Sequence, residues 1–368
     1  MSKPRIILAM PNHVGLMKII SDSLTHHSFE VLCFDQLISP ERFKYPNLYS
    51  RIYKGYRKLV YNDRDYKTTL RDPQNTQYIE EKLQQWGGYA DYTLVIRPDV
   101  FSQGVLELLK ARTRGTFAGY QWDGLTRFPS IFSRIKLFDR FFVFDPQDYQ
   151  HQHNARIFPI TNFCVEHALI NDKETPSNKS PVVYFVGYHN ASRQQAIEQL
   201  VGELSKHEVE IKCLINHAPA NAYNHLPILK IKDKIDFNDN LANVQQADIL
   251  IDLVIGEHTG LSFRTFEALF FKKKLISNNA SIVHYDFYHP DNILLWDGKD
   301  DGALQRFLAV PYNTATDDIA AKYHFGNWIR YVLDIGDYTP ITLPILNMMQ
   351  DQSRISSSVS NAKATAEI

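Results

Sequence analysis

The sequence predicts an α/β protein built from two doubly wound parallel sheets that face each other across a cleft. Short apolar strands alternate with helical segments, which is the pattern of βαβ units. The alternation forms two series, separated by a polar connection at about Pro159 to Pro181 that contains NDKETPSNKSP. A chain of 368 residues with 44% hydrophobic content is long enough to bury two ordinary cores.

The first series predicts one Rossmann-like half. It opens with a strand, a helix and a second strand, at Arg5 to Met10, Leu16 to Leu24 and Glu30 to Phe34. Further strands are expected at Asp91 to Ile96, Thr116 to Tyr120 and Arg140 to Phe144, with a helix at Val105 to Arg112. These elements lie within an N-terminal domain that we place at residues 1–165.

The second series predicts another such half. It contains a strand, a helix and a strand at Val182 to Val186, Gln194 to Lys206 and Val209 to Ile215, and it ends near Leu295. The run Ala247 to Ile255 is broken only by Asp248 and Asp252, as expected for a central parallel strand. We place this domain at residues 166–335. Residues 336–368 form a C-terminal segment expected to return to the first domain and to end in a polar, disordered tail.

Composition excludes several classes of protein. A formal net charge of −1 and a pI near 6.9 give no general attraction to nucleic acid. The three cysteines are far apart and form no CxxC pair, which argues against a disulfide framework or structural zinc and fits a reducing cytoplasm. The sequence shows neither a membrane-spanning apolar run nor a signal peptide.

The most informative stretch runs from Gly256 to Asn279, where a strand leads through a polar turn into a helix. Thr259 or Ser262 can cap this helix, and Lys272 to Lys274 are expected at its last turn. A helix that starts at the carboxyl edge of a parallel sheet points backbone N–H groups outward, so it can bind a phosphate.

Two side chains of this helix fit nucleotide binding. Arg264 can add a charge-assisted hydrogen bond to phosphate, and Glu267 can accept from ribose hydroxyls. The alternative is an ordinary surface ion pair, because the two residues are three apart on a helix. Gly187 can let a phosphate approach the backbone, and Arg193 can neutralise its charge; the alternative is a turn glycine and a solvated arginine.

The stretch resembles the nucleotide-sugar site of GT-B glycosyltransferases, in which a Gly-Leu-Ser/Thr-x-Arg-x-x-Glu-Ala segment precedes a lysine-ended helix. The resemblance is to bacterial enzymes that build capsule, lipopolysaccharide and exopolysaccharide. Further segments resemble the same group in the same order, and together they cover most of residues 90 to 333: YQWDGLTRFP, FDRFFVFDPQDY, YFVGYHNASR, YDFYHPDNI and YHFGNWI.

This resemblance implies a nucleotide-sugar donor bound by the second half, with no other cofactor. The implied donor contacts are Gly187, Arg193, Glu257, His258, Thr259, Gly260, Ser262, Arg264 and Glu267. Many relatives carry a glutamine near the position of Glu257 and His258. Many retaining members carry two glutamates eight positions apart; Glu267 matches the second, whereas Glu257 lies ten positions before it. The sequence therefore leaves the stereochemistry open.

The first half is expected to hold the acceptor and any catalytic base. His13 and Gly15 follow the first strand, Asp99 follows a later one, and Trp122 and Asp123 follow the strand that ends near Tyr120. For an inverting reaction, Asp123 is the first candidate base and His13 the second. The alternative for Asp123 is a helix N-cap or a bond to the backbone.

A basic, tyrosine-rich segment at Arg51 to Lys67 contains the pair Asp63 and Asp65. This Asp-x-Asp does not follow a buried strand, so it predicts no metal site. The cations of the segment can rest on anionic lipid, where the enzyme would meet a lipid-linked acceptor; the alternative is a solvated helix with aromatic core contacts.

The function predicted from these features is transfer of a sugar from a nucleotide-sugar donor to a growing cell-surface glycan. The acceptor would be a saccharide or a lipid-linked glycan, and the enzyme would be cytoplasmic or peripheral on the inner face of the membrane. The alternatives are a catalytically silent GT-B-like scaffold subunit and a sugar-nucleotide epimerase. The sequence does not specify the donor sugar, nucleotide, acceptor, linkage or oligomeric state.

Overall fold

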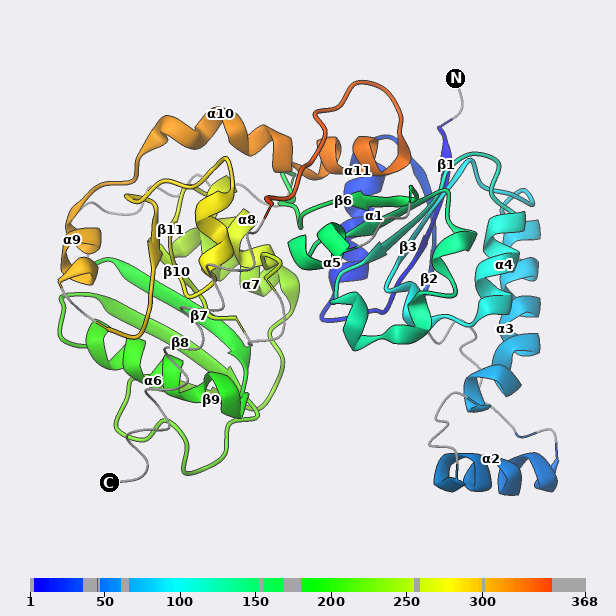
Figure 1. The fold of residues 1–368 in the computed structure, drawn as a ribbon, viewed down its shortest axis with the longest axis horizontal. Coiled ribbons are helices and arrows are strands. Elements are labelled where there is room, and N and C mark those ends of the chain that lie inside the picture. Colours follow the sequence, from blue (N-terminus) through cyan, green and yellow to red (C-terminus); the bar gives the residue numbers. More distant parts are fainter. Residues whose placement is uncertain are drawn as a thin grey trace.

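Two six-stranded parallel sheets form the body of the protein (Figure 1). The computed structural model describes residues 3–35, 45, 47–60, 66–151, 155–167, 180–254, 259–299 and 302–345. Residues up to 167 form the first sheet, and residues from 180 onward form the second. We call these two parts of the chain the first half and the second half.

The first sheet has the strand order β2-β1-β3-β4-β5-β6. Alternate residues of β1 lie in different core clusters, so both faces of the sheet are buried, as the apolar sequence of this strand requires. The strands are β1 (Arg5–Ala9), β2 (Glu30–Phe34), β3 (Tyr92–Ile96), β4 (Phe117–Gln121), β5 (Arg140–Val143) and β6 (Ile157–Pro159). The helices are α1 (Leu16–His26), α2 (Leu48–Val60), α3 (Tyr66–Gln85), α4 (Gln103–Ala111) and α5 (Pro146–His151).

The second sheet has the order β12-β11-β10-β7-β8-β9. Its strands are β7 (Val182–Tyr188), β8 (Glu210–Asn216), β9 (Ile228–Ile231), β10 (Ile249–Asp252), β11 (Lys274–Ser277) and β12 (Ile293–Leu295). The helices α7 (Phe237–Gln246) and α8 (Phe263–Phe270) pack on one face, and α6 (Ala191–Leu204) and α9 (Ala303–Ala309) pack on the other. Both sheets are therefore doubly wound, as predicted.

The strand and helix predictions hold with shifts of a few residues at their ends. The strand predicted at Ala247 to Ile255 is shorter, because only Ile249–Asp252 pairs with its neighbours. The prediction that Lys272 to Lys274 lie in the last turn of α8 is wrong. That helix ends at Phe270, Lys272 has a φ of 52°, and Lys274 begins β11.

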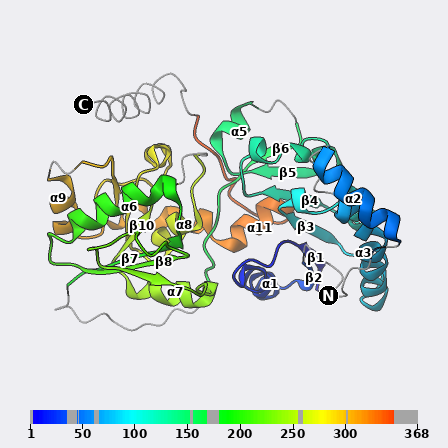
Figure 2. The same ribbon diagram turned by 90° about the horizontal axis from the view of Figure 1, so that it is seen from below.

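The chain returns to the first half before its end. Helix α10 (Asp317–Ala320) leads toward α11 (Phe325–Leu333), which packs on β4 and β5 of the first sheet (Figures 1 and 2). The Trp328 indole donates to Thr161 O at 2.9 Å, and the Tyr331 hydroxyl donates to Pro159 O at 3.0 Å. The crossing thus falls inside the 166–335 range that the sequence predicts for the second domain.

Helix α2 lies at one end of the molecule, beside α3 (Figure 1). It covers the first part of the basic, tyrosine-rich segment, whereas Asp63 and Asp65 lie outside the described residues. Within the described part of the chain, no helix combines the length and hydropathy needed to cross a bilayer.

Candidate functional site

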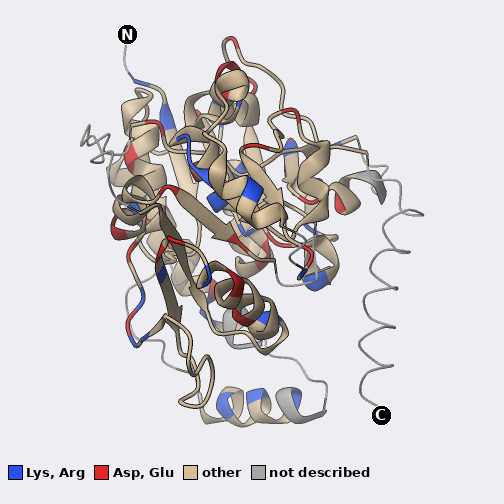
Figure 3. Ribbon diagram, turned by 90° about the vertical axis from the view of Figure 1, so that its left-hand side faces the viewer, with Lys and Arg blue, Asp and Glu red and all other residues tan. Residues whose placement is uncertain are grey.

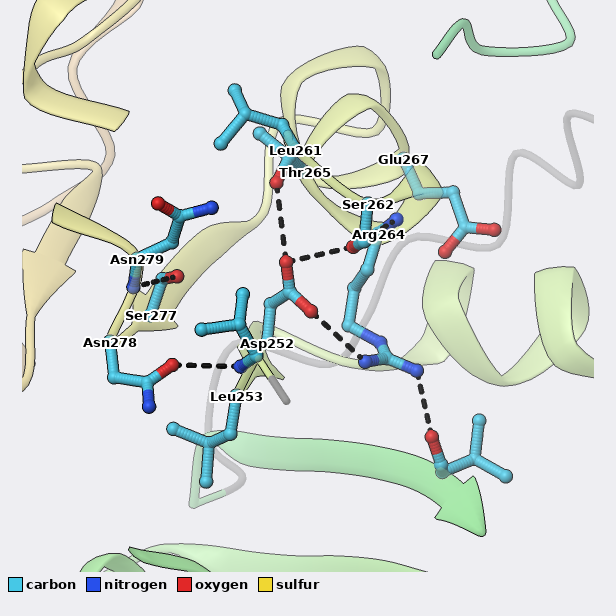
Figure 4. Close-up of polar contacts among 12 residues, drawn as sticks. Asp252, Leu253, Leu261, Ser262, Arg264, Thr265, Glu267, Ser277, Asn278 and Asn279 are labelled. Atoms are coloured by element: carbon cyan, nitrogen blue, oxygen red, sulfur yellow. Dashed lines mark hydrogen bonds and ion pairs between the residues drawn. The ribbon is translucent and has the colours of Figure 1, made fainter. Parts of the chain in front are cut away.

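The start of α8 is built around Asp252, the last residue of β10 (Figure 4). Ser262 caps the helix, because its Oγ accepts from the Arg264 backbone N–H at 3.1 Å; this confirms Ser262, and not Thr259, as the N-cap. The same hydroxyl donates to Asp252 Oδ2 at 2.7 Å. Asp252, only 5% exposed, therefore ties the helix N-terminus to the carboxyl end of the strand.

Arg264 is held at the rim of the second sheet by two strands. Its Nη2 donates to Val186 O of β7 at 2.7 Å, and its Nη1 lies 3.5 Å from Asp252 Oδ1 (Figure 4). The guanidinium also lies over the Phe185 ring, 5.3 Å from its centroid. Arg264 is therefore no solvated surface ion-pair partner but a fixed positive charge beside the helix N-terminus.

Glu267, one turn further along α8, is 4% exposed. Burial raises its pKa to about 7, although the positive charge of Arg264 and a hydrogen bond from Asn240 act in the opposite direction. Asn240 Nδ2 of α7 donates to Glu267 Oε1 at 3.3 Å. A carboxylate buried with one amide donor has acceptor capacity left for a further hydroxyl.

A chain of hydrogen bonds sets the direction of the Asn240 amide. Lys212 Nζ donates to Asn243 Oδ1 at 2.6 Å, and Asn243 Nδ2 donates to the Tyr184 hydroxyl at 3.4 Å. Tyr184 in turn donates to Asn240 Oδ1 at 3.2 Å, which leaves the Asn240 NH₂ group facing Glu267. Burial raises the pKa of Tyr184 to about 12, so its hydroxyl keeps the proton that it donates.

Removing this hydroxyl should make Glu267 harder to ionise. In Tyr184→Phe the Asn240 amide loses its anchor and donates less well to Glu267, so we expect the pKa of Glu267 to rise by about half a unit to one unit. Carbon NMR of labelled glutamate carboxyl groups measures it. Tyr331→Phe, which removes a similar hydroxyl from α11 where that helix packs on the first sheet, should leave the titration unchanged. The titratable groups around Glu267 are Arg264, Asp252, Tyr184 and Cys164.

A cavity of about 340 Å³ lies beside this helix start and is lined by both halves. The second half contributes Gly187, Lys234, Arg264 and Glu267, and the loop after β1 contributes His13. Gly187, Arg264 and Glu267, which the sequence predicts for the donor, are therefore brought together with a residue predicted for the acceptor side. Pattern reasoning missed Lys234, because it follows β9, a short edge strand without a clear apolar signal.

His13 is held in its neutral form. Its pKa is lowered, first by burial and then by the positive charges of Lys234 and Arg97. A lowered pKa means that the imidazole is unprotonated at pH 7, so it can accept a proton. Among the predicted bases, His13 is the one that lines the cavity.

Gly187 and Arg193 have different positions relative to this cavity. Gly187 lines the cavity. Arg193 lies outside the cavity lining, and its Nη1 donates to Leu253 O at 3.1 Å and its Nη2 to Tyr188 O at 2.7 Å. A Cβ on Gly187 would come within 2.9 Å of the Arg193 guanidinium. Arg193 is thus a brace for the end of β7, neither the predicted phosphate ligand nor a solvated arginine.

Asp99 and Asp123 both form ion pairs with Arg97, a residue that the sequence pattern did not single out. Arg97 donates to both oxygens of Asp99, at 2.7 and 2.8 Å, and to Asp123 Oδ2. Arg127 adds a longer contact of 3.4 Å to Asp123 Oδ1. Asp123 is therefore no helix N-cap; it and Asp99 share the charge of Arg97, while Trp122 packs at the edge of the core.

Thr259 and Gly260 lie against the first half and not in the cavity. The Thr259 N–H and hydroxyl donate to the two oxygens of Asp145, at 3.0 and 2.7 Å. A Cβ on Gly260 would come within 3.0 Å of three atoms of the Phe144 ring. In the same way, a Cβ on Gly15, which has a φ of 79°, would clash with the carboxylate of Asp236.

Glu257 and His258 lie outside the described residues. Among the side chains that the structure describes, no group of three or more His, Cys, Asp or Glu is placed to hold a metal ion.

Solved structures share this architecture, although no family model and no curated sequence matches the chain. A trehalose-6-phosphate synthase, studied for glycosyltransfer with retention, has a TM-score of 0.55 at 10% identity over 92% of this chain and 100% of its own. A structure described as trehalose-6-phosphate from E. coli bound with UDP-2-fluoro glucose has a TM-score of 0.54 at 11% identity, again over 92% of this chain and 100% of its own. The OtsA apo structure gives 0.51 at 10%, over 91% and 100%. The predicted GT-B fold is thereby confirmed.

Proposed function

We propose that this protein is a nucleotide-sugar-dependent glycosyltransferase that extends a cell-surface glycan such as capsule, lipopolysaccharide or exopolysaccharide. The observation that carries the proposal is the cavity in which Arg264, Glu267 and Lys234 of the second half meet His13 of the first. The E. coli structure of the same fold, described as bound with UDP-2-fluoro glucose, supports a donor of this class.

Each side chain of the cavity has a role in this proposal. The N-terminus of α8, Arg264 and Lys234 bind the diphosphate, because helix N–H groups and cations stabilise negative charge, including the charge that grows on the leaving group. The Glu267 carboxylate accepts from ribose hydroxyls. No metal or other cofactor enters the proposal, so chelators should leave transfer unchanged.

The acceptor, a saccharide or lipid-linked glycan, would enter from the first half, at the inner face of the membrane. We propose His13 ahead of Asp123 as the base of an inverting reaction, because His13 is neutral and lines the cavity whereas Asp123 is paired with Arg97. For a retaining reaction His13 would orient a sugar hydroxyl.

A thermal-shift screen across UDP, GDP, CMP and dTDP sugars tests the proposal, because a ligand that binds only the folded state raises the melting temperature. We expect one nucleotide series to raise it and the matching sugar to be transferred to a glycan acceptor. Binding without transfer to any acceptor would favour the scaffold alternative, and conversion of the donor alone would favour the epimerase.

Substituting His13 tests the role of the base. In an inverting enzyme, His13→Gln should lower the transfer rate by about 100-fold or more and leave donor affinity within a few fold. Initial rates at saturating donor measure this, with Asp123→Asn assayed beside it. If Asp123→Asn alone abolishes transfer, the order of the two candidates is reversed.

A further inference from the structure

Helix α2 presents a row of large apolar side chains to solvent. Leu48 is 70% exposed, Tyr49 69%, Ile52 64% and Tyr56 50%. At 100° per residue these four positions fall within an arc of about 100° on one side of the helix. The opposite side faces the protein, where Ser50 is buried and bonded to Asn47.

All the charged residues of the same helix are basic. Its sequence LYSRIYKGYRKLV contains four basic and no acidic residues. Arg51 is exposed at one edge of the apolar row. Arg57 lies about two turns from Ser50 on the opposite side, with its guanidinium 5.9 Å from the centre of the Tyr53 ring. Figure 3 shows Lys and Arg positions, in blue, on the helix at one end of the molecule. An apolar row on one side, with Lys and Arg on the remaining surface, is typical of helices that lie in a membrane interface.

We propose that α2 docks the protein on an anionic lipid surface, with Leu48, Tyr49, Ile52 and Tyr56 inserted among the headgroups. A lipid surface suits this helix better than a second copy of the chain. A symmetric contact between two α2 helices would bring eight cations together, whereas anionic headgroups neutralise them. The clustering of exposed apolar side chains also exceeds the scattered exposure usual on a monomer surface.

This inference rests on the proposed function in one respect, since docking would bring the cavity near a lipid-linked acceptor. Vesicle binding itself does not depend on catalysis. A protein that binds vesicles but no nucleotide sugar would contradict the proposed function alone, and the reverse result would contradict the docking proposal alone.

Co-sedimentation of the full-length protein with vesicles tests the docking. We expect binding to phosphatidylcholine vesicles that contain phosphatidylglycerol and much weaker binding to phosphatidylcholine alone. Removing two cations of the helix in Arg51→Gln/Arg57→Gln should lower partition by about fivefold for each charge, and higher salt should have a similar effect. Leu48→Ser/Ile52→Ser should lower it by about tenfold or more at every salt concentration.

The chain offers matched controls in the second half. Leu229, 61% exposed, gives Leu229→Ser, and exposed Lys299 gives Lys299→Gln. Both should bind vesicles like the wild type. Equal binding of wild type and both α2 variants, or no binding to anionic vesicles, would overturn the proposal. Self-association that only the α2 variants lose would identify a second copy as the occupant and overturn it as well.

Discussion

Replacing Glu267 with alanine should weaken nucleotide-sugar binding by about 30- to 150-fold, which corresponds to about 2 to 3 kcal/mol for hydrogen bonds to a buried carboxylate. Glu267 is 4% exposed and lies in the cavity beside Arg264. In the alanine variant, bulk water therefore cannot replace the carboxylate as the acceptor for the ligand hydroxyls. Isothermal titration calorimetry with the nucleotide selected by thermal shift measures the change. Unaltered affinity would show that the site is wrong.

Glu267→Gln separates this loss from misfolding. The pKa of Glu267, raised by burial from 4.5 to about 7, means that the folded state resists ionisation. The stability associated with this group is present below pH 4.5 and is lost as the pH rises through 7. A neutral glutamine avoids that loss, so Glu267→Gln should be more stable than the wild type at pH 8, by up to about 3 kcal/mol, and nearly equal at pH 4. It should still bind nucleotide poorly.

Gly260→Ala should disturb the contact between the two halves. The new methyl group would meet the buried ring of Phe144, which follows β5 in the first half, so either the ring or the adjoining segment must move. We expect a loss of about 2 kcal/mol in unfolding free energy and a large fall in transfer rate, because His13 would leave its place opposite Arg264. Nucleotide affinity, which depends on the second half, should change less.

Gly202→Ala is the matched control for this substitution. Gly202 lies inside α6, and a Cβ there would meet no atom within 4 Å. Alanine in a helix interior should stabilise the protein by about 0.5 to 1 kcal/mol. Urea denaturation of both variants measures the contrast, and equal stability of the two would contradict the tight contact at Gly260.

The features that sequence reasoning predicted well are local. The two N-cap candidates Thr259 and Ser262, of which Ser262 is the cap, follow from residues a few positions apart, and the alternation of strands and helices gives both sheets. The burial of Glu267 was not predictable from the pattern, because it depends on Asn240 from another helix. A charged residue that ends an apolar run, as Asp252 does, is the signal that could have identified the residue to which Ser262 and Arg264 bind.

The features that the sequence left open depend on contacts between distant segments. Arg193 has the same spacing whether it binds a phosphate or braces β7, and only the positions of Leu253 O and Tyr188 O decide between them. Thr259 bonds to Asp145, which is 114 residues away. Arg97, which has a φ of 58°, forms ion pairs with two carboxylates. No motif in the sequence predicts these contacts.

The central claim is that a nucleotide sugar binds where α8 begins, between Glu267 and His13. Hydrogen exchange with and without the bound nucleotide tests it most directly, because backbone protection reports where the ligand lies. We expect slower exchange at residues 262–268, 186–188 and 231–240, and in the loop that carries His13, with no change in α9. Protection confined to the first half, or absent around residues 262–268, would contradict the account.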